Sequence, residues 1–580
     1  MIFGYMTRRD RLMLVPVVVL VIFQVYLDLK IPEYMQSITY ALQVGTTSAL
    51  IVEDGWKMIL CALASFAASL CAGALIALIA SSLSRTLRNE LYSKVCGFSS
   101  EDVAHFSAAS LITRVTGDVK EVQTFVSTAL QTLIKSPILA VWAIAKISGG
   151  GWEWTAVTAA SVIFLVSAIS LITALSVKYF RRAQVLTDSL NDETRESILG
   201  SKVVRAYNAE DFQGHKFQKA SEDMLDNYMG LFHVRFALFL LPPVVTNFLT
   251  MAIYWIGAVL ISGSGAEDVQ MRLFSDMVAF SSYGLQVLGA FMLIADFIKD
   301  YPHVVVSIRR VEDVLRWEPT VKYPDPEGPA GPGCGRVEFR NVTFRYPGTK
   351  RDSLSGVSFS VGEGQTLGII GRTGSGKITV ARLLLRNYDV DGGAVLVDGM
   401  DVRSYPHDDL RGRMACAFQE PFIFSGTVRE NVDFGNQEGS RSDSDVWASL
   451  GIAQAEEFVR AMPQGLDSVL LSGGKNLSGG QRQRLSIARA VCKGSRILIL
   501  DDSFSALDMS TDAALGRALR ESLADRTKII ISQRVRSIID ADEILVLDGG
   551  RVVGLGTHEE LLGSCPVYAE IVRTQMEVWK

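Results

Sequence analysis

The chain has few charged residues and no patterned cysteines. Asp, Glu, Lys and Arg make up only 21% of its 580 residues, whereas hydrophobic residues make up 48% and the mean hydropathy is +0.24. This balance argues against a purely cytosolic enzyme and suits a membrane protein with a substantial soluble part. The seven cysteines are scattered, without a CxxC pair, a Cys/His metal spacing or a disulfide framework, so we expect them to serve in packing.

The chain also has no basic tract, and we expect no cleavable leader at its beginning. Lys and Arg are spread through the chain and the net charge is -5, so nothing supports binding to nucleic acid. The first apolar stretch, residues 12–29, is not followed by a small-residue cleavage motif, which predicts a retained membrane span. The length alone predicts several domains, or a membrane portion with a soluble one.

Long hydrophobic runs fill the first half. A helix needs ~20 apolar residues to cross the hydrocarbon core, and the candidate spans are 12–29, 58–81, 129–148, 155–177, 236–261 and 277–298. Basic residues gather before the first span and in the loops between spans two and three and between four and five, which are therefore expected on the cytoplasmic side. This predicts an α-helical membrane domain of about six helices, a multi-pass protein of the cell membrane in contact with lipid, with both termini in the cytosol.

The two cytoplasmic connections are long and have apolar residues at helical spacing, so they are expected to extend the membrane helices. Asp28, Lys135 and Asp296 fall near span ends. Ionisable groups at membrane depth are functional candidates by default, but exposure at the interface costs little. We expect an anchoring role for these three residues, and no substrate site is readable from them.

A Pro/Gly-rich run begins at Pro319 and cannot continue a helix. After it, short β-branched runs alternate with helical segments, as in an α/β domain. The predicted organisation is therefore a transmembrane domain over 1–317, a linker over 318–334 and an α/β domain over 335–580, which the last span places in the cytosol. The motifs described next predict that this α/β domain is a P-loop ATP-binding domain.

A strand, a glycine loop and a helix follow one another after residue 366. In such a loop backbone N–H groups approach the phosphates of a nucleotide, a lysine adds a point charge, and the helix N-terminus favours an anion. The expected helix runs through Arg386, and the ATP-binding residues are Gly371, Arg372, Thr373, Gly374, Ser375, Gly376, Lys377, Ile378 and Thr379.

A second apolar strand, 496–500, ends in Asp501 and Asp502, where a carboxylate would hold Mg²⁺ directly or through water.

The pentapeptide between these two motifs indicates a family. The chain resembles the ABC transporter superfamily, whose signature motif is represented by Leu477, Ser478, Gly479, Gly480 and Gln481. The resemblance implies further roles in the family's order: Tyr346 stacks on adenine, Gln419 is the Q-loop glutamine that acts in catalysis and at the metal, residues 505–508 are the D-loop, and Gln533 is the switch residue. Residues 110–118 and 196–207 look like the intracellular helices of ABC exporters.

Three positions depart from the family's pattern. Ile378 replaces the Ser or Thr whose hydroxyl ligates Mg²⁺, and Thr379 is about 100° further round the helix. Asp502 stands where a Glu usually polarises the attacking water, and Gln533 where a His is common. The resemblance also implies that two ATP-binding domains pair head to tail, so that each site joins one P-loop to the partner's signature. The expected protein is the degenerate subunit of a heterodimeric exporter, whose LSGGQ completes the partner's hydrolytic site.

Two alternatives are left open: a slow homodimer with two equal sites, and an ATP-gated channel or regulatory subunit that binds nucleotide without pumping. For the transporter, the resemblance implies ATP and Mg²⁺ as cofactors and alternating access as the mechanism, with residues 104–110 and 203–212 as candidate coupling segments. The substrate and the direction of transport are not readable from the sequence.

Overall fold

The structure is a computed structural model that describes residues 2–45, 48–149, 151–325, 333–435 and 441–577. It divides into two compact units. The first comprises Met1–Val95 and Ala109–Trp317, and the second comprises Cys96–Ala108 and Glu318–Lys580. The predicted linker, 318–334, falls partly on residues 326–332, which lie outside the described residues, so its bounds stay a prediction.

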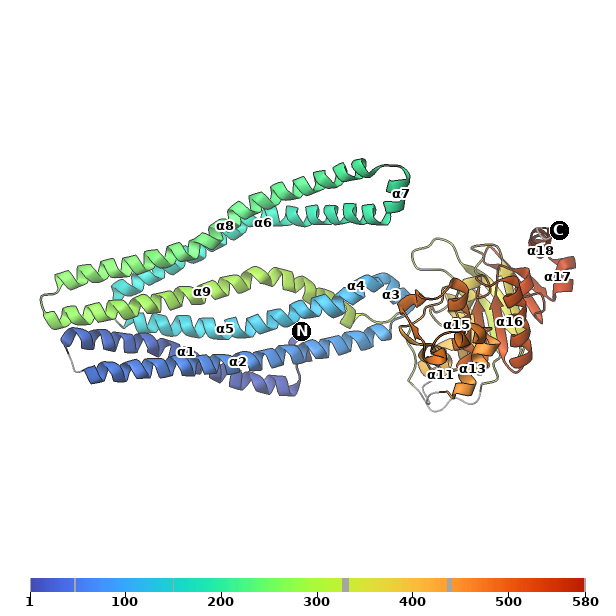
Figure 1. The fold of residues 1–580 in the computed structure, drawn as a ribbon, viewed down its shortest axis with the longest axis horizontal. Helices are drawn as coiled ribbons and strands as arrows, with labels where there is room; N and C mark the ends of the chain where they lie inside the picture. Colours follow the sequence, from blue (N-terminus) through green and yellow to red (C-terminus); the bar gives the residue numbers. More distant parts are fainter. Residues whose placement is uncertain (1, 46–47, 150, 326–332, 436–440, 578–580) are drawn as a thin grey trace. The chain divides into compact units, whose positions relative to one another are not determined.

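The first unit is built of long helices (Figure 1). Among the described residues, six helical segments are long and apolar enough to cross a membrane, as predicted. The long helices are α1 (Arg8–Val44), α2 (Ser48–Cys96), α5 (Val119–Ser148), α6 (Trp152–Leu199), α8 (Glu210–Gly263) and α9 (Glu267–Arg316). Short elements accompany them: η1 (Ile2–Tyr5), α4 (Ala108–Thr113), the π-helical turn η2 (Arg114–Asp118) and α7 (Ser201–Ala206).

Helices α6 and α8 lie side by side and are joined through α7 (Figure 1). Close approach along α8 depends on glycine. A Cβ on Gly230 would lie 2.6 Å from the ring of Tyr179 on α6, and a Cβ on Gly257 would lie 2.5 Å from Sδ of Met277 on α9 and 3.1 Å from the buried Trp154 on α6. Small residues at such contacts let membrane helices pack by van der Waals attraction.

The three ionisable residues near the span ends, Asp28, Lys135 and Asp296, line one cavity of about 570 Å³, and their anchoring role stays a prediction. Nζ of Lys135 on α5 lies 3.4 Å from Oδ2 of Asp28 on α1. On α9, Gln286 donates a hydrogen bond to the carbonyl of Asp28 at 3.3 Å, and Asp296 also lines the cavity. The packing of three helices therefore gathers residues that the sequence places far apart.

In the part of the second unit that the structure describes, there are two larger sheets and a two-stranded pair, β7 with β8. The first sheet has the order β12-β11-β3-β10-β9-β6 and is parallel except for the edge strand β12, while the second, antiparallel sheet has the order β2-β1-β4-β5. The strands are β1 (Val337–Phe344), β2 (Leu354–Val361), β3 (Thr366–Gly371), β4 (Gly392–Val397), β5 (Met400–Asp401), β6 (Met414–Ala417), β7 (Gly426–Thr427), β8 (Val469–Leu470), β9 (Ile497–Asp501), β10 (Thr527–Ile531), β11 (Glu543–Asp548) and β12 (Arg551–Gly556).

Strands β3, β9 and β10 are buried along their whole length, as expected for parallel strands covered on both faces. Their side chains alternate between two hydrophobic clusters, with Ile497 and Ile499 in one and Leu498 and Leu500 in the other. The helices of this unit are α3 (Ser100–Phe106), α10 (Lys377–Leu384), α11 (His407–Arg413), α12 (Val428–Val432), α13 (Asp443–Ile452), α14 (Glu456–Arg460), α15 (Gly479–Cys492), α16 (Met509–Ser522), α17 (His558–Ser564) and α18 (Pro566–Glu577).

The helix after the glycine loop is shorter than predicted. It ends at Leu384, and Arg386 has a left-handed backbone with φ of 49°. The Arg386 side chain explains this ending because it turns inward to bind other segments. Its guanidinium donates to Asp389 at 2.9 Å and to the carbonyl of Lys322 at 2.8 Å, and it lies 4.4 Å from the centroid of the Tyr323 ring. The start of the predicted linker is thereby attached to the second unit.

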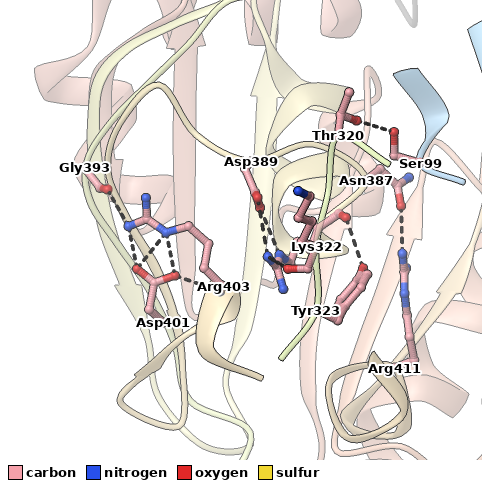
Figure 2. Close-up of polar contacts among 11 residues, drawn as sticks. Ser99, Thr320, Lys322, Tyr323, Asn387, Asp389, Gly393, Asp401, Arg403 and Arg411 are labelled. Atoms are coloured by element: carbon pink, nitrogen blue, oxygen red, sulfur yellow. Dashed lines mark hydrogen bonds and ion pairs between the residues drawn. The ribbon is translucent and has the colours of Figure 1, made fainter. Parts of the chain in front are cut away.

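The same segment also reaches α3. The Thr320 hydroxyl lies 2.7 Å from that of Ser99 (Figure 2), and the backbone N–H of Thr320 donates to the buried carboxylate of Asp102 at 3.2 and 3.3 Å. Residues 96–108 therefore belong to the compact unit that contains both sheets.

Candidate nucleotide site

Four predicted site segments follow the carboxyl ends of neighbouring strands in the parallel sheet. The glycine loop follows β3, Asp501 ends β9 with Asp502 next to it, Gln533 follows β10, and Gln419 follows β6. In open α/β sheets ligands bind at this edge, outside the carboxyl ends of the strands. The fold therefore collects residues that are more than 150 positions apart in the sequence.

The glycine loop is shaped by close backbone approaches. Gly374 and Gly376 have φ of 81° and 99°, values that side-chain-bearing residues rarely adopt. A Cβ on Gly376 would lie 2.6 Å from the carbonyl oxygen of Ser353, so the turn has no room for one. The buried Lys377 Nζ donates to the carbonyls of Gly371 and Arg372, both at 2.8 Å, which folds its side chain over the loop.

Two buried carboxylates face this lysine. Burial lowers the pKa of Lys377, while the charges of Asp502 and Asp501 act to raise it. Burial and the neighbouring Asp502 raise the pKa of Asp501 to about 6. Burial also raises the pKa of Asp502, against a backbone hydrogen bond from Gln533 that lowers it. The Gln419 amide approaches Asp502 Oδ2 at 3.4 Å, so the predicted Q-loop, carboxylate and switch residues meet here.

The site has buried polar atoms that a nucleotide and a cation would satisfy. In the described part of the chain, Ser375 Oγ, Asp501 Oδ1 and Asp502 Oδ1 are buried without a hydrogen-bond partner. Such atoms are costly unless a ligand or ion completes them. The residues therefore fit a nucleotide with Mg²⁺: the loop amides and Lys377 would hold phosphate, and the two carboxylates would hold the cation.

Ile378 and Thr379 lie on different sides of the α10 start. Thr379 is buried, and its hydroxyl lies 3.2 Å from the phenol oxygen of Tyr346, so its side chain is directed away from the phosphate loop. The Tyr346 ring contacts Phe344 and Tyr388 edge to face and receives the Arg382 guanidinium at 5.7 Å from its centroid. The predicted stacking of Tyr346 on adenine stays a prediction.

The signature motif forms the exposed beginning of α15. Ser478 caps the helix: its hydroxyl accepts from the Gln481 N–H at 3.2 Å, and Gln481 Oε1 accepts from the Ser478 N–H at 2.9 Å. Leu477 is buried and anchors the turn, whereas Ser478 and Gly479 are exposed. Among the described residues no hydrogen bond joins this motif to residues 371–379 of the same chain.

Sequence reasoning missed several residues that hold these loops. Arg534 donates to the carbonyls of Phe504, Ser505 and Leu507 at 3.4, 2.7 and 3.2 Å, which fixes the predicted D-loop. Gln483, in the first turns of α15, donates to the Phe418 carbonyl beside Gln419 at 3.2 Å. Gln483 was visible beside the signature, but no periodicity or spacing indicated the partner of either side chain.

Comparison with known proteins identifies the families to which the two parts of the chain are similar. Residues 13–291 match the family described as ABC transporter transmembrane region, and residues 354–505 match ABC transporter. An uncharacterized ABC transporter ATP-binding protein of Mycobacterium tuberculosis is 35% identical over 85% of this chain and 83% of its own length. A probable multidrug resistance ABC transporter ATP-binding/permease protein of Bacillus subtilis is 33% identical, over 84% and 82% of the two chains.

Two further comparisons extend this result. An ATP-dependent lipid A-core flippase of Vibrio cholerae is 31% identical over 88% of this chain and 86% of its own length. The solved structure of a bacterial Atm1-family ABC exporter with ATP bound superposes with a TM-score of 0.81 at 24% identity, covering 97% of this chain and 98% of that one, which shows the same fold. ABC exporters function as dimers, and their ATP-binding domains imply ATPase activity coupled to transport. The chain belongs to the ABC transporter family, as a multi-pass membrane subunit that carries a transmembrane domain and an ATP-binding domain in one polypeptide.

Proposed function

We propose that this chain is the degenerate-site subunit of a heterodimeric ABC exporter. It binds ATP at its own phosphate loop, hydrolyses it there slowly, and supplies LSGGQ to a second half-transporter whose site carries most of the hydrolysis. Closure of the paired ATP-binding domains then drives alternating access in the membrane helices.

The observation that carries this proposal is the contrast between the two motifs. At the phosphate loop, Ile378 offers no oxygen to a cation, and the neighbouring hydroxyl of Thr379 is directed to Tyr346 at 3.2 Å. Asp502 is one methylene shorter than the glutamate common in the family, and an error of about 1 Å in position costs ~10²-fold in rate. The signature helix, in contrast, is intact, capped and exposed at Ser478.

The chain's own residues have distinct roles in this scheme. Lys377 and the loop amides hold phosphate, and Asp501 organises the Mg²⁺, which when bound neutralises phosphate charge. Gln419 and Gln533 lie against Asp502, so they respond to the occupancy of the site. The half-buried Gln481 and the capped turn with its exposed Ser478 face a partner's nucleotide.

We further propose that both termini and the ATP-binding domain are cytoplasmic, because the basic residues gather in loops on that side. The domain bounds are 1–317, 318–334 and 335–580. Residues 104–110 and 203–212 are the coupling segments. The first of these is supported by α3, whose Asp102 binds the backbone of Thr320 within the compact unit that contains the nucleotide site.

The test is the ATPase activity of the purified full chain, alone and with the half-transporter encoded beside it. We expect little activity alone and high activity together. Gln481→Ala should lower the joint activity by roughly 10²-fold or more, the loss typical of removing groups that stabilise a transition state. Lys475→Ala, an exposed residue shortly before the signature, should leave the activity unchanged.

Robust turnover by a stable dimer of this chain alone would replace the heterodimer with a homodimer of two equal sites. A transport measurement distinguishes the exporter from the other alternative, a gated channel or a regulatory subunit. Uphill accumulation of a substrate in vesicles, driven by ATP, excludes a gated channel or a purely regulatory subunit.

A further inference from the structure

The C-terminal helix α18 is seated on the ATP-binding domain by a buried stripe. Tyr568 is fully buried and Val572 nearly so, and Gln575 continues the same face at helical spacing of i, i+4 and i+7. The Tyr568 hydroxyl lies 2.7 Å from Nδ1 of His558, and the helix packs against β3, β11 and the turn η6 (Val535–Ser537). The orientation of Gln575 is therefore set by the core beneath it.

Gln575 makes two hydrogen bonds to the switch segment, residues 532–535. Its Nε2 donates to the backbone carbonyl of Gln533 at 2.6 Å, and its Oε1 accepts from the backbone N–H of Val535 at 2.9 Å. One carboxamide thus satisfies a carbonyl and an N–H two residues apart, as a neighbouring strand would.

On its other side the switch segment faces the reacting groups. The backbone of Gln533 hydrogen-bonds to Asp502, and the Arg534 side chain holds the carbonyls of Ser505 and Leu507 in the D-loop. The segment is short, with its own internal bond from the Arg534 N–H to Ser532 Oγ at 2.9 Å. A displacement of Gln533 therefore moves the groups at Asp502 and the D-loop together.

The same helix also contacts the phosphate loop. The Glu570 carboxylate lies 2.6 Å from the Arg372 guanidinium, but both side chains are more than half exposed, so this ion pair contributes little by itself. The two-point contact of Gln575 is the stronger constraint.

We propose that Gln575 is a positioning residue for ATP hydrolysis: its carboxamide fixes the switch segment so that Gln533 and Arg534 hold Asp502 and the D-loop in place. The proposal rests on the nucleotide-site function given above and assigns to α18 a role in it. It gives the C-terminal helix control over turnover without any contact with the nucleotide.

The experiment uses the full chain, both with its partner half-transporter and alone. Gln575→Met keeps the length of the side chain and removes both hydrogen bonds. In the complex we expect backbone hydrogen exchange in 532–536 to accelerate. In the full chain alone, where the partner's faster site does not contribute, we expect the slow kcat of its own site to fall by roughly 5-fold, the effect of losing a hydrogen bond of ordinary strength. KM for ATP and the melting temperature should stay within about 2-fold and a few degrees of wild type.

Thr574→Ala is the matched control, because it removes an exposed hydroxyl from the adjacent position without touching the switch segment. Gln575→Glu is a second variant that keeps the acceptor for Val535 and loses the donor to Gln533, so it tests the same contact if Gln575→Met does not fold. Exchange and kcat equal to those of Thr574→Ala in both variants would overturn the proposal. A wild-type complex that hydrolyses no ATP would instead refute the proposed function, while the exchange rates still report on the Gln575 contact.

Discussion

At the scale of single residues, the candidate nucleotide site combines a glycine loop with tight backbone turns and an aliphatic side chain, Ile378, where the family's pattern has a Ser or Thr. The turn at Gly376 leaves no room for a side chain, and Lys377 is folded over the loop carbonyls. Nothing in the packing of α10 requires an isoleucine at 378, which is only partly buried. A hydroxyl there is therefore compatible with the fold.

Ile378→Thr should strengthen the Mg²⁺ dependence of nucleotide binding. The hydroxyl adds an oxygen to the cation, and a contact to a charged group is worth about 1.5–3 kcal/mol, or roughly 10-fold or more in affinity. Titration of the full chain with ATP, with and without Mg²⁺, measures this gain. Ile378→Val, which has nearly the shape of threonine and no oxygen, is the control, and equal Mg²⁺ responses of the two variants would contradict the prediction.

The buried carboxylate of Asp501 predicts that the folding stability of the metal-free protein falls as pH rises. Its pKa is raised from 3.8 to about 6, so the folded state binds the proton more tightly than the unfolded chain. The contribution of this proton to the free energy of unfolding is fully present below the pKa of the unfolded chain and is lost as pH rises through about 6. Above that pH the ATP-binding domain is less stable by about 3 kcal/mol.

Asp501→Asn should therefore stabilise the EDTA-treated protein at about pH 8 and change it much less at about pH 5. Thermal unfolding at the two pH values, with and without Mg-ATP, measures the difference. The variant should also lose the stabilisation that Mg-ATP gives to wild type. An equal change in melting temperature at both pH values would show that the carboxylate is not the group responsible.

At the scale of elements, the membrane helices are much longer than the apolar runs that reveal them. Helix α2 has 49 residues, whereas its predicted span is 58–81, because hydropathy marks only the part inside the hydrocarbon core. Their packing depends on the absence of side chains at contacts such as Gly257, where α8 meets Met277 and Trp154.

Gly257→Val should destabilise the transmembrane domain by about 1–3 kcal/mol, because its methyl groups would overlap Sδ of Met277. Gly263→Val at the end of the same helix meets nothing within 4 Å and serves as the control. Thermal unfolding in detergent, followed by retention of the folded peak in size-exclusion chromatography, compares the two. Similar losses for both would indicate a general intolerance of valine in α8 and not a steric contact.

The sequence predicted the motifs that are contiguous in the chain, and it left open the contacts between residues that are far apart in the chain. The strand, loop and helix around Lys377 are contiguous, so their pattern was sufficient, as were the apolar runs of the six spans. The contact of Gln575 with Gln533 joins residues 42 positions apart, and that of Asp102 with Thr320 joins residues 218 apart. Such pairings depend on how helices and sheets pack, for which periodicity has no signal.

At the scale of the whole molecule, the proposed topology places every soluble element on one side of the membrane. Cys334 precedes β1 and is exposed. In a Cys96→Ser background, a membrane-impermeant maleimide should label Cys334 in inside-out vesicles and not in intact cells, because only the inside-out vesicles present the cytoplasmic face to the reagent. Cys334→Ser is the control for the labelled band in mass spectrometry. Labelling in intact cells would reverse the proposed orientation.

The placement of α3 affects how such chains exchange parts during evolution. The compact unit with the nucleotide site is discontinuous in the sequence, because residues 96–108 join it through Asp102, Ser99 and Thr320. A recombination event after residue 317 would join the new catalytic domain to the old α3. Only those recombinants whose incoming segment still offers a backbone N–H to Asp102 would keep that carboxylate hydrogen-bonded. The ATP-binding domain is therefore harder to exchange as a single gene segment than its position after the membrane helices suggests.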